Sequence, residues 1–255
     1  MLSVIIITEN ESDHLAQCLE SVSWANEIII VDSGSTDDTV AIAKKYTPHV
    51  YTMADWEGYG IQKQRALGKA TGDWVLNIDA DEVVTESLKL KIQQIMADSS
   101  VDACRIPIFL VFNDTVLKHT SSPKRHIRLF RRQGAEYGQK IIHEGIVLPD
   151  SSHIIQLTEP LMHHSFRDFS HALYKLNRYS SYTAKTRLHQ KKSASLTMAI
   201  LRSLWMFFNT YFLKGGFLDG KLGFIFAVFN MEGTFYRSIK QIYPDRNLNE
   251  LPFVK

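Results

Sequence analysis

The sequence predicts an α/β protein with a mainly parallel, doubly wound sheet, and three observations support this prediction. Short apolar runs rich in β-branched residues, at 3–8, 27–32 and 73–79, alternate with segments whose apolar residues recur at helical spacing. Each of these runs ends in polar residues. The length of 255 residues, with 45% hydrophobic and 22% charged residues, suits one large domain with an appendage.

The predicted elements follow one another in order through the first hundred residues. A strand at 3–8 precedes a helix at 15–22, and a strand at 27–32 precedes a helix near 40–46. A third strand is expected at 49–52, a helix at 62–70, a fourth strand at 73–79 and a helix at 88–96. This alternation predicts right-handed βαβ crossovers and parallel strands.

The pattern changes after residue 103. The runs CRIPIFLVF and RHIRLFRR resemble longer strands with no helix between them, which predicts an antiparallel extension of the sheet. Beyond Phe166 the chain becomes helical and amphipathic, and Gly215, Gly216 and Gly220 are expected to break it into short helices. We therefore expect a domain at 1–165, with halves at 1–100 and 101–165, and a helical region at 166–255.

Polar residues gather at three predicted strand ends, 8–11, 32–35 and 79–82. Ligands of open α/β sheets bind beyond these carboxyl ends. Asp79 and Asp81 would share one face of an ideal strand while Glu82 faces elsewhere. Such a pair can hold Mg²⁺ or Mn²⁺ against diphosphate oxygens. The alternative, an acid-rich helix N-terminus, suits Glu82 better than Asp79.

Three further side chains are candidates for the site. Asp32, followed by Gly34, could accept a nucleobase N–H or close an Asx-turn. Lys63 and Arg65 lie just upstream of the acidic strand and could counter the charge of a diphosphate, for which arginine is well suited. An exposed, solubilising charge is the alternative for Lys63.

Charge is unevenly distributed along the chain. Residues 1–117 carry eight Lys and Arg against 18 Asp and Glu, whereas residues 165–255 carry 14 against five. A cation-assisted site in the N-terminal part and an anionic partner of the C-terminal part would explain this asymmetry. Solvated faces that are unevenly distributed along the chain would explain it as well. The two distant cysteines favour a reduced, cytoplasmic setting, and the N-terminal run is expected to be a strand and not a signal peptide. No nucleic-acid-binding motif accompanies the basic residues.

The ordered motifs SVIIITENE, VDSGSTDDT and QKQRAL…ATGDWVLNIDADE resemble the family-2 glycosyltransferases, which are inverting enzymes of the GT-A fold. The later motifs RHIRLFRR, YGQKIIHEG, HHSF and YFLKGGFLDGKLGF are similar to those of the bacterial lipopolysaccharide-core β-1,4-glucosyltransferase subgroup. The resemblance implies a GT-A nucleotide-diphospho-sugar transferase fold, with donor binding in 1–100 and acceptor binding in 101–165.

The resemblance also implies roles for individual residues. Thr8, Asn10 and Glu11 fall in the first nucleotide-contacting loop, and Asp32 falls where the family contacts uracil. Asp79 and Asp81 form the D-x-D pair, which implies Mg²⁺ or Mn²⁺, with Asp79 shared between the metal and the ribose. His163 matches a histidine near the metal. Gln64 stands where many members have Asn, which puts a donor contact there in doubt.

Inverting transfer needs a base and a stabilised leaving group. The resemblance places Glu144 as the carboxylate that takes the acceptor hydroxyl proton, with His143 as an alternative base or an acceptor contact. The implied donor is a UDP-sugar carrying glucose, and the implied acceptor is the lipopolysaccharide core. Alternatives are transfer to another envelope polysaccharide or glycolipid, a nucleotidyltransferase, and a non-catalytic protein that binds a nucleotide-sugar or glycan.

Two basic segments indicate where the acceptor and its lipid would lie. Arg125, Arg128 and Arg131 could bind phosphates of a lipid-linked core acceptor, although a solvated strand face explains their spacing nearly as well. Residues 195–229 mix aromatics with Arg202 and Lys214, as expected of an element at an anionic membrane surface. Packing on the catalytic domain is the alternative. The resulting expectation is a peripheral protein on the cytoplasmic face of the inner membrane.

Overall fold

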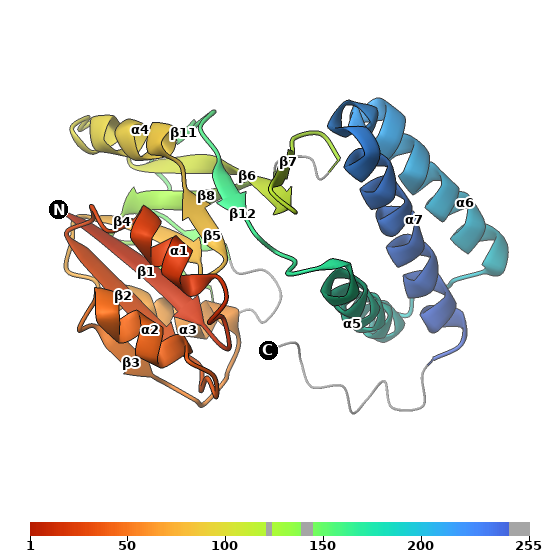
Figure 1. Cartoon of the computed structure of the whole chain (residues 1–255), viewed down its shortest axis with the longest axis horizontal. Helices are drawn as coiled ribbons and strands as arrows, with labels where there is room; N and C mark the ends of the chain where they lie inside the picture. Colours follow the sequence, from red (N-terminus) through yellow and green to blue (C-terminus); the bar gives the residue numbers. More distant parts are fainter. Residues whose placement is uncertain (121–123, 139–144, 245–255) are drawn as a thin grey trace. The chain divides into compact units, whose positions relative to one another are not determined.

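The computed structural model describes residues 1–120, 124–138 and 145–244, and its chain forms two compact units. The first unit comprises Met1–Ile108 and Lys124–His164, and the second comprises Phe109–Pro123 and Ser165–Lys255. The sheet lies mainly in the first unit, and the long helices lie in the second (Figure 1).

Four parallel strands form the centre of the first unit: β1 (Leu2–Thr8), β2 (Glu27–Asp32), β3 (Val50–Thr52) and β4 (Trp74–Asp79). They are ordered β3-β2-β1-β4. Thr8 is opposite Asp32 on one side of β1, and Ile7 is opposite Asp79 on the other. The polar residues at the ends of β1, β2 and β4 therefore meet at one edge of the sheet.

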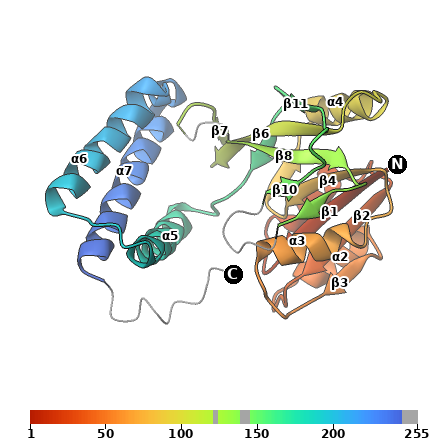
Figure 2. The ribbon, with the colours of Figure 1, turned by 180° about the vertical axis from the view of Figure 1, so that it is seen from behind.

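Helices cover both faces of this sheet. Val4 and Ile6 of β1 pack into a core shared with α1 (Leu15–Ser21), α2 (Thr39–Tyr46) and α4 (Glu86–Met96). Ile5, between them, faces a second core shared with α3 (Tyr59–Leu67), which lies on the opposite face of the sheet (Figure 2). A strand that buries alternate residues on both faces explains the unbroken apolar run SVIII.

The second half of the sheet contains antiparallel pairs. β8 (Lys124–Arg131) pairs with β4 on one side and with β6 (Ala103–Phe112) on the other. The order continues through β12 (Leu161–His163) to β5 (Glu82–Val84), while β11 (Ile154–Gln156) pairs with β6. A small separate ladder joins β9 (Glu136–Tyr137) to β10 (Ile146–Val147). The predicted parallel sheet with an antiparallel extension is confirmed.

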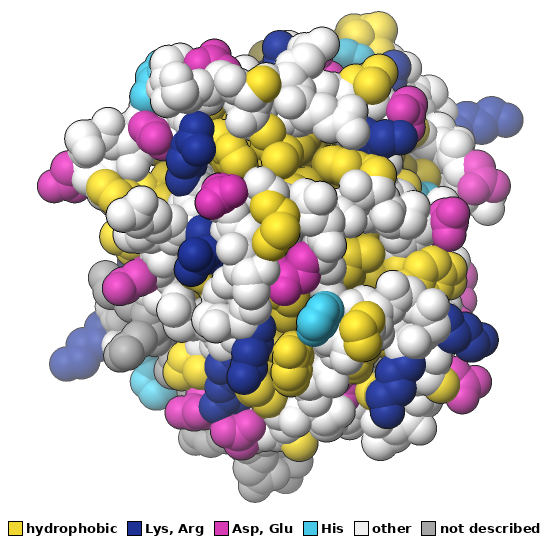
Figure 3. Space-filling model, turned by 90° about the vertical axis from the view of Figure 1, so that its left-hand side faces the viewer, with side chains coloured by type: hydrophobic (Ala, Val, Ile, Leu, Met, Phe, Trp, Pro, Cys, Tyr) yellow, Lys and Arg dark blue, Asp and Glu magenta, His cyan; other side chains and the backbone are white. Residues whose placement is uncertain are grey.

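On the face of the first unit drawn in Figure 3, charged side chains of both signs lie scattered between hydrophobic ones. The acidic excess of the front half of the chain does not gather into one patch there.

The second unit contains α5 (Phe169–His189), α6 (Leu196–Phe208) and α7 (Gly220–Ile242). A π-helical turn, η1 (Asn209–Leu213), and a 3₁₀ turn, η2 (Gly216–Asp219), connect α6 to α7, and β7 (Thr115–Leu117) pairs with the end of β6. The predicted breaks at Gly215, Gly216 and Gly220 are present, but the helix after them is not short, because α7 continues for 23 residues through two interior glycines. Within the described residues, none of the helices combines the length and the apolarity that crossing a bilayer requires.

Candidate functional site

The loops that follow β1 and β2 are joined by side-chain hydrogen bonds. Asn10, which adopts a positive φ of 55°, donates its backbone N–H to Ser35 Oγ at 2.8 Å. The backbone N–H of Glu11 donates to Thr39 Oγ1 at 2.9 Å. Thr8 Oγ1 is buried at the end of β1 and has no hydrogen-bond partner among the described residues. This hydroxyl is the kind of buried polar atom that a bound ligand could satisfy.

Asp32 closes the turn after β2. Its carboxylate is buried and accepts hydrogen bonds from the backbone N–H groups of Gly34 and Ser35, both at 3.0 Å, and from the Ser35 hydroxyl at 2.5 Å. An ionised carboxylate offers about four acceptor positions, so three are already used. The turn-closing role is therefore present in the structure, and the contact with a nucleobase stays a prediction.

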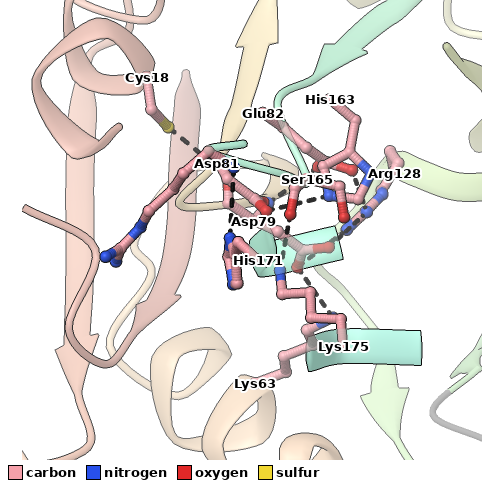
Figure 4. Close-up of polar contacts among 11 residues, drawn as sticks. Cys18, Lys63, Asp79, Asp81, Glu82, Arg128, His163, Ser165, His171 and Lys175 are labelled. Atoms are coloured by element: carbon pink, nitrogen blue, oxygen red, sulfur yellow. Dashed lines mark hydrogen bonds and ion pairs between the residues drawn. The ribbon is translucent and has the colours of Figure 1, made fainter. Parts of the chain in front are cut away.

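Asp79, at the end of β4, is held by two cationic side chains (Figure 4). Arg128 Nη2 lies 2.8 Å from Oδ2, and Lys63 Nζ lies 3.2 Å from Oδ1. Burial acts to raise the pKa of Asp79, but the charges of Arg128 and Lys63 outweigh it and hold that pKa well below its usual range. Asp79 is therefore an ionised carboxylate whose charge is already compensated by the protein.

Glu82 faces the site, contrary to the sequence prediction. The chain turns at Ala80 and Asp81, so that β5 brings Glu82 back beside the end of β4. Its carboxylate accepts the Asp79 backbone N–H at 2.9 Å and lies 2.6 Å from Arg128 Nη2. Burial raises the pKa of Glu82, and the Arg128 charge opposes that rise. The alternation of an ideal strand failed here because the strand ends at Asp79.

Arg128 reaches these acids because β8 contains a bulge at its position. Leu129 is opposite Cys104 and Ile127 is opposite Arg105, which leaves Arg128 without a partner in the ladder. An extra residue of this kind bends a strand and redirects a side chain. The Arg128 side chain is 7% exposed and lies between Asp79 and Glu82.

The expected basic acceptor surface does not form from the three arginines of β8. Arg128 is buried in the acidic site, so the prediction that it binds the acceptor from the surface is corrected. Arg125 is exposed and donates to Gln156 Oε1 at 3.0 Å. Arg131 lies over the Trp74 ring, with its guanidinium carbon 4.5 Å from the ring centroid. The three arginines lie three residues apart, a spacing that places successive ones on opposite faces of an ideal strand, and the bulge lies at Arg128.

Asp81 forms a second pair, with His163. His163 Nε2 lies 3.1 Å from Asp81 Oδ2, and both side chains are partly exposed, at 29% and 13%. Two features hold the pair together: His163 is opposite Glu82 in the β12–β5 ladder, and the His164 backbone N–H donates to the Asp81 carbonyl at 2.8 Å. Burial lowers the pKa of His163, but the Asp81 carboxylate more than offsets this and raises it to about 9.

The two predicted cations on α3 have different surroundings. Lys63 contacts Asp79, whereas the Arg65 guanidinium lies 2.7 Å from Asp55 and 2.5 Å from Glu57. In this structure the Arg65 guanidinium therefore forms ion pairs with neighbouring acids. A diphosphate would have to compete with Asp55 and Glu57 for it. Gln64 Oε1 accepts the backbone N–H of Tyr137 at 2.8 Å, which gives it a structural role.

Sequence reasoning missed Glu82, the buried role of Arg128, and Gln62. Gln62, which is fully buried, donates to Ser33 Oγ at 3.0 Å and to the Met53 carbonyl at 2.8 Å, and so ties α3 to the loops after β2 and β3. Its place four residues before Ala66, on the buried side of the predicted helix, was the signal that the sequence offered. The predicted base Glu144 and the alternative His143 lie outside the described residues.

A divalent cation fits Asp81 and His163 better than Asp79. A carboxylate and an imidazole 3.1 Å apart can both be ligands for Mn²⁺ once the imidazole has released its proton, and magnesium sites commonly use one or two carboxylates with substrate phosphates. Asp79 would have to give up its ion pairs to serve as a ligand. In the described part of the chain, no three His, Cys, Asp or Glu side chains are grouped so as to hold a metal. A cation here would need further oxygen ligands from a substrate.

Comparison with known families and curated proteins gives one consistent result. Residues 3–147 match the model of glycosyl transferase family 2. An uncharacterized glycosyltransferase of Rickettsia conorii is 32% identical over 94% of this chain and 89% of its own length. The lipopolysaccharide core biosynthesis glycosyltransferase LpsC of Rhizobium meliloti is also 32% identical, over 99% of this chain and 96% of its own.

Solved structures share the fold at low sequence identity. The mannosyltransferase PcManGT of Pyrobaculum calidifontis, in complex with GDP-Man and Mn²⁺, has a TM-score of 0.57 at 13% identity, covering 96% of this chain and 88% of that one. TarS of S. aureus, residues 1–349, has a TM-score of 0.50 at 16% identity, covering 96% and 92%. Together with the family match, these likenesses confirm the predicted GT-A fold.

Proposed function

Because the chain belongs to glycosyltransferase family 2, we propose that it transfers a hexose, with inversion, from a UDP-sugar to a lipopolysaccharide core or a related envelope glycan. The observation that carries this proposal is the pairing of Asp79 with Lys63 and of Asp81 with His163 at the carboxyl edge of the sheet. A charge-compensated carboxylate beside a carboxylate–imidazole pair suits the binding of a nucleoside diphosphate.

Asp81 and His163 are the proposed cation ligands, for either Mg²⁺ or Mn²⁺. When bound, such an ion neutralises the charge that develops on a leaving diphosphate. The precedent for a metal in this fold is the Mn²⁺ in the PcManGT structure. Asp79, fixed by Arg128 and Lys63, is proposed to bind the ribose hydroxyls instead, since its oxygens are already oriented and charged.

The loops after β1 and β2 are proposed to bind the nucleoside. Thr8, Asn10 and Glu11 line the first loop and Asp32 closes the second, and the hydrogen bonds between these loops hold them in register. Lys63 is the proposed counter-charge for the diphosphate, because it is the cation nearest Asp79 on α3. Arg65 could join it only by leaving Asp55 and Glu57.

The acceptor side is proposed from the family resemblance. Glu144 would take the proton of the acceptor hydroxyl as that oxygen attacks the anomeric carbon, and the nucleoside diphosphate would leave from the opposite face. Arg125, Arg131 and His143 are the proposed acceptor contacts. The relative named LpsC supports a lipopolysaccharide core as the acceptor, and glucose as the transferred sugar rests on the resemblance alone. A lipid-linked acceptor places the protein at the cytoplasmic face of the inner membrane.

The direct test is release of UDP from a panel of UDP-sugars, with Mn²⁺, with Mg²⁺ and with chelator, using delipidated lipopolysaccharide core as the acceptor. We expect release from one sugar that requires both a cation and the core. The Glu144→Gln variant should bind the donor and release little UDP. Donor binding without release from any sugar, in the presence of several envelope glycans, would favour a non-catalytic nucleotide-sugar-binding protein.

A further inference from the structure

The helical hairpin of α6 and α7 buries small side chains and exposes large apolar ones. On α6 the buried positions are Ala199 and Ser203, at 1% and 5% exposure. Leu201, Leu204 and Trp205, on the outer side of the same helix, are 57%, 57% and 58% exposed. A hairpin stabilised by water-driven burial would have the opposite arrangement.

The facing helix α7 has the same distribution at its first turns. Gly223 and Ala227 are buried, whereas Phe224 is 49% exposed. A Cβ at Gly223 would overlap the carbonyl oxygen of Gly216 in η2, so the backbone of α7 is in close contact with that turn. Phe226 is the exception, because its buried ring packs against Phe112. Small residues that allow close helix contact, with large apolar residues outside, are typical of helix pairs in lipid.

The exposed apolar residues form a continuous stripe along α6 and η1. The stripe consists of Leu201, Leu204, Trp205, Phe208 and Phe212, which recur at intervals of three or four residues. The Trp205 and Phe208 rings have centroids 5.9 Å apart, and the Phe208 and Phe212 rings 5.3 Å apart. Figures 1 and 2 both show α6 alongside α7 in the helical unit. We call this set the α6 stripe.

The charges beside the α6 stripe favour an anionic partner. Arg202 is adjacent to Leu201 in sequence, Lys214 lies two residues after Phe212, and both side chains are exposed. Asp219 is the only acidic residue between 194 and 228, and its carboxylate accepts N–H groups of Lys118, His119 and Thr120. A second copy of the chain, docked across a two-fold axis on this stripe, would bring Arg202 towards its own counterpart.

We propose that the α6 stripe is a membrane-docking surface that enters the interfacial layer of a bilayer carrying anionic headgroups. α6 has 13 residues and so spans about 20 Å, less than the roughly 30 Å of a hydrocarbon core. It therefore lies in the interface, with Trp205 and the phenylalanine rings on the lipid side. This inference rests on the proposed function, because the α6 stripe would give the protein access to a lipid-linked acceptor.

The first test is flotation of the full chain with vesicles of phosphatidylcholine alone and with phosphatidylglycerol added. We expect strong binding to the anionic vesicles. The double variant Leu201→Gln/Leu204→Gln should bind about tenfold more weakly or worse, because two apolar contacts are lost. Leu90→Gln/Val147→Gln changes two equally exposed apolar residues of the first unit and should bind like wild type. Arg202→Gln should weaken binding roughly fivefold on anionic vesicles only.

A second measurement locates the contact without disturbing it. Brominated lipids should quench tryptophan fluorescence of the wild type, and Trp205→Phe should remove that quenching while flotation is retained. The proposal is overturned if the wild type floats with neither kind of vesicle, or if quenching persists in Trp205→Phe. It is also overturned if the free protein is a stable dimer that Leu201→Gln/Leu204→Gln dissociates.

The docking proposal and the proposed function can be tested separately. UDP release with delipidated core, which needs no bilayer, should be unchanged in Leu201→Gln/Leu204→Gln. If vesicle binding follows the expected pattern but no UDP-sugar is consumed by the wild type, the proposed function fails and the docking surface stands. If transfer proceeds and flotation is absent, the docking surface alone fails.

Discussion

Arg128 and Asp79 lie 49 residues apart in the chain and form a part-buried ion pair of 2.8 Å. The same guanidinium nitrogen lies 2.6 Å from Glu82, so that one cation compensates two carboxylates at the end of β4. Asp81, between them in sequence, faces His163 instead. The two acids of the D-x-D motif thus have separate partners, which supports separate roles for them.

The first prediction concerns Arg128. Arg128→Met would leave the buried Glu82 without its cation and Asp79 with Lys63 alone, and removing one member of a buried ion pair such as Arg128–Glu82 commonly costs about 3–5 kcal/mol. We expect a lower unfolding temperature and UDP binding weakened by about tenfold or more, since Asp79 loses its orientation. Thermal unfolding and calorimetric titration with UDP measure the two effects.

The Arg128→Lys variant separates the effect of the positive charge from that of the guanidinium geometry. Lysine supplies one ammonium group and cannot bridge two carboxylates as a planar guanidinium does. It should recover part of the unfolding temperature but little of the UDP affinity. Equal recovery of both would show that only the charge matters. Arg125→Met, an exposed change on the same strand, is the matched control and should leave both quantities unchanged.

The second prediction concerns Lys63. Lys63→Met keeps the Asp79–Arg128 pair and removes the cation proposed to face the diphosphate. We expect UDP affinity to fall by roughly tenfold, as for a lost charge-assisted contact, with a much smaller loss for uridine, which lacks the diphosphate. Lys69→Met, an exposed lysine just after the same helix, is the control. An equal loss for UDP and uridine would contradict a diphosphate role.

The sequence was sufficient for the parts of the fold that depend on local pattern. The runs that became β1, β2 and β4 are apolar on both faces and end in polar residues, so both the strands and their functional ends could be predicted. Asp79 and Asp81 followed from the same reasoning. The meeting of Asp81 with His163 was expected only from the family resemblance, because nothing local links two residues 82 positions apart.

The failures come from backbone irregularities and competing partners. The bulge at Arg128 reverses the alternation of β8, so an arginine that the pattern placed on a solvated face is buried. The turn at Ala80 and Asp81 likewise brings Glu82 inward. Arg65 was expected at a diphosphate, but the acids of the preceding loop already occupy its guanidinium. These outcomes depend on tertiary contacts that a periodic pattern does not contain.

The third prediction concerns the proposed cation ligands. Asp81→Asn and His163→Ala should each weaken Mn²⁺ binding in the presence of UDP by roughly 10–100-fold, as expected on losing a metal ligand or its partner. Electron paramagnetic resonance of free Mn²⁺ measures this without any turnover. Removing the cation with chelator should abolish transfer, and adding Mn²⁺ should restore it.

Asp79→Asn provides the contrasting case for the metal. Since Asp79 faces Arg128 and Lys63, its substitution should reduce UDP affinity more than it reduces the number of Mn²⁺ ions bound. A loss of Mn²⁺ binding as large as that of Asp81→Asn would show that both acids are ligands. Asp98→Asn, an exposed carboxylate just after the C-terminal end of α4, is a suitable surface control.

The fourth prediction concerns Asp219, which ties η2 to the segment after β7. Its carboxylate accepts the backbone N–H groups of Lys118, His119 and Thr120 at 3.1, 3.0 and 2.7 Å, and the Thr120 hydroxyl at 2.7 Å. Asp219→Ala should lower the free energy of unfolding at neutral pH by about 1.5–3 kcal/mol, the usual range for hydrogen bonds to a charged group. Asp150→Asn, an exposed carboxylate, should change it little.

The contribution of Asp219 to the free energy of unfolding should depend on pH. Burial acts to raise the pKa of Asp219, but the hydrogen bonds from Thr120, His119 and Lys118 outweigh it and lower that pKa below its usual value. The folded state therefore binds the proton less readily than the unfolded state does. The stabilisation is complete above about pH 4, the usual range of an aspartate, and is lost as the pH falls through the lower folded-state pKa. The wild type should lose its advantage over Asp219→Asn across this acidic window, and a constant difference between the two proteins down to the lowest pH would contradict the assignment.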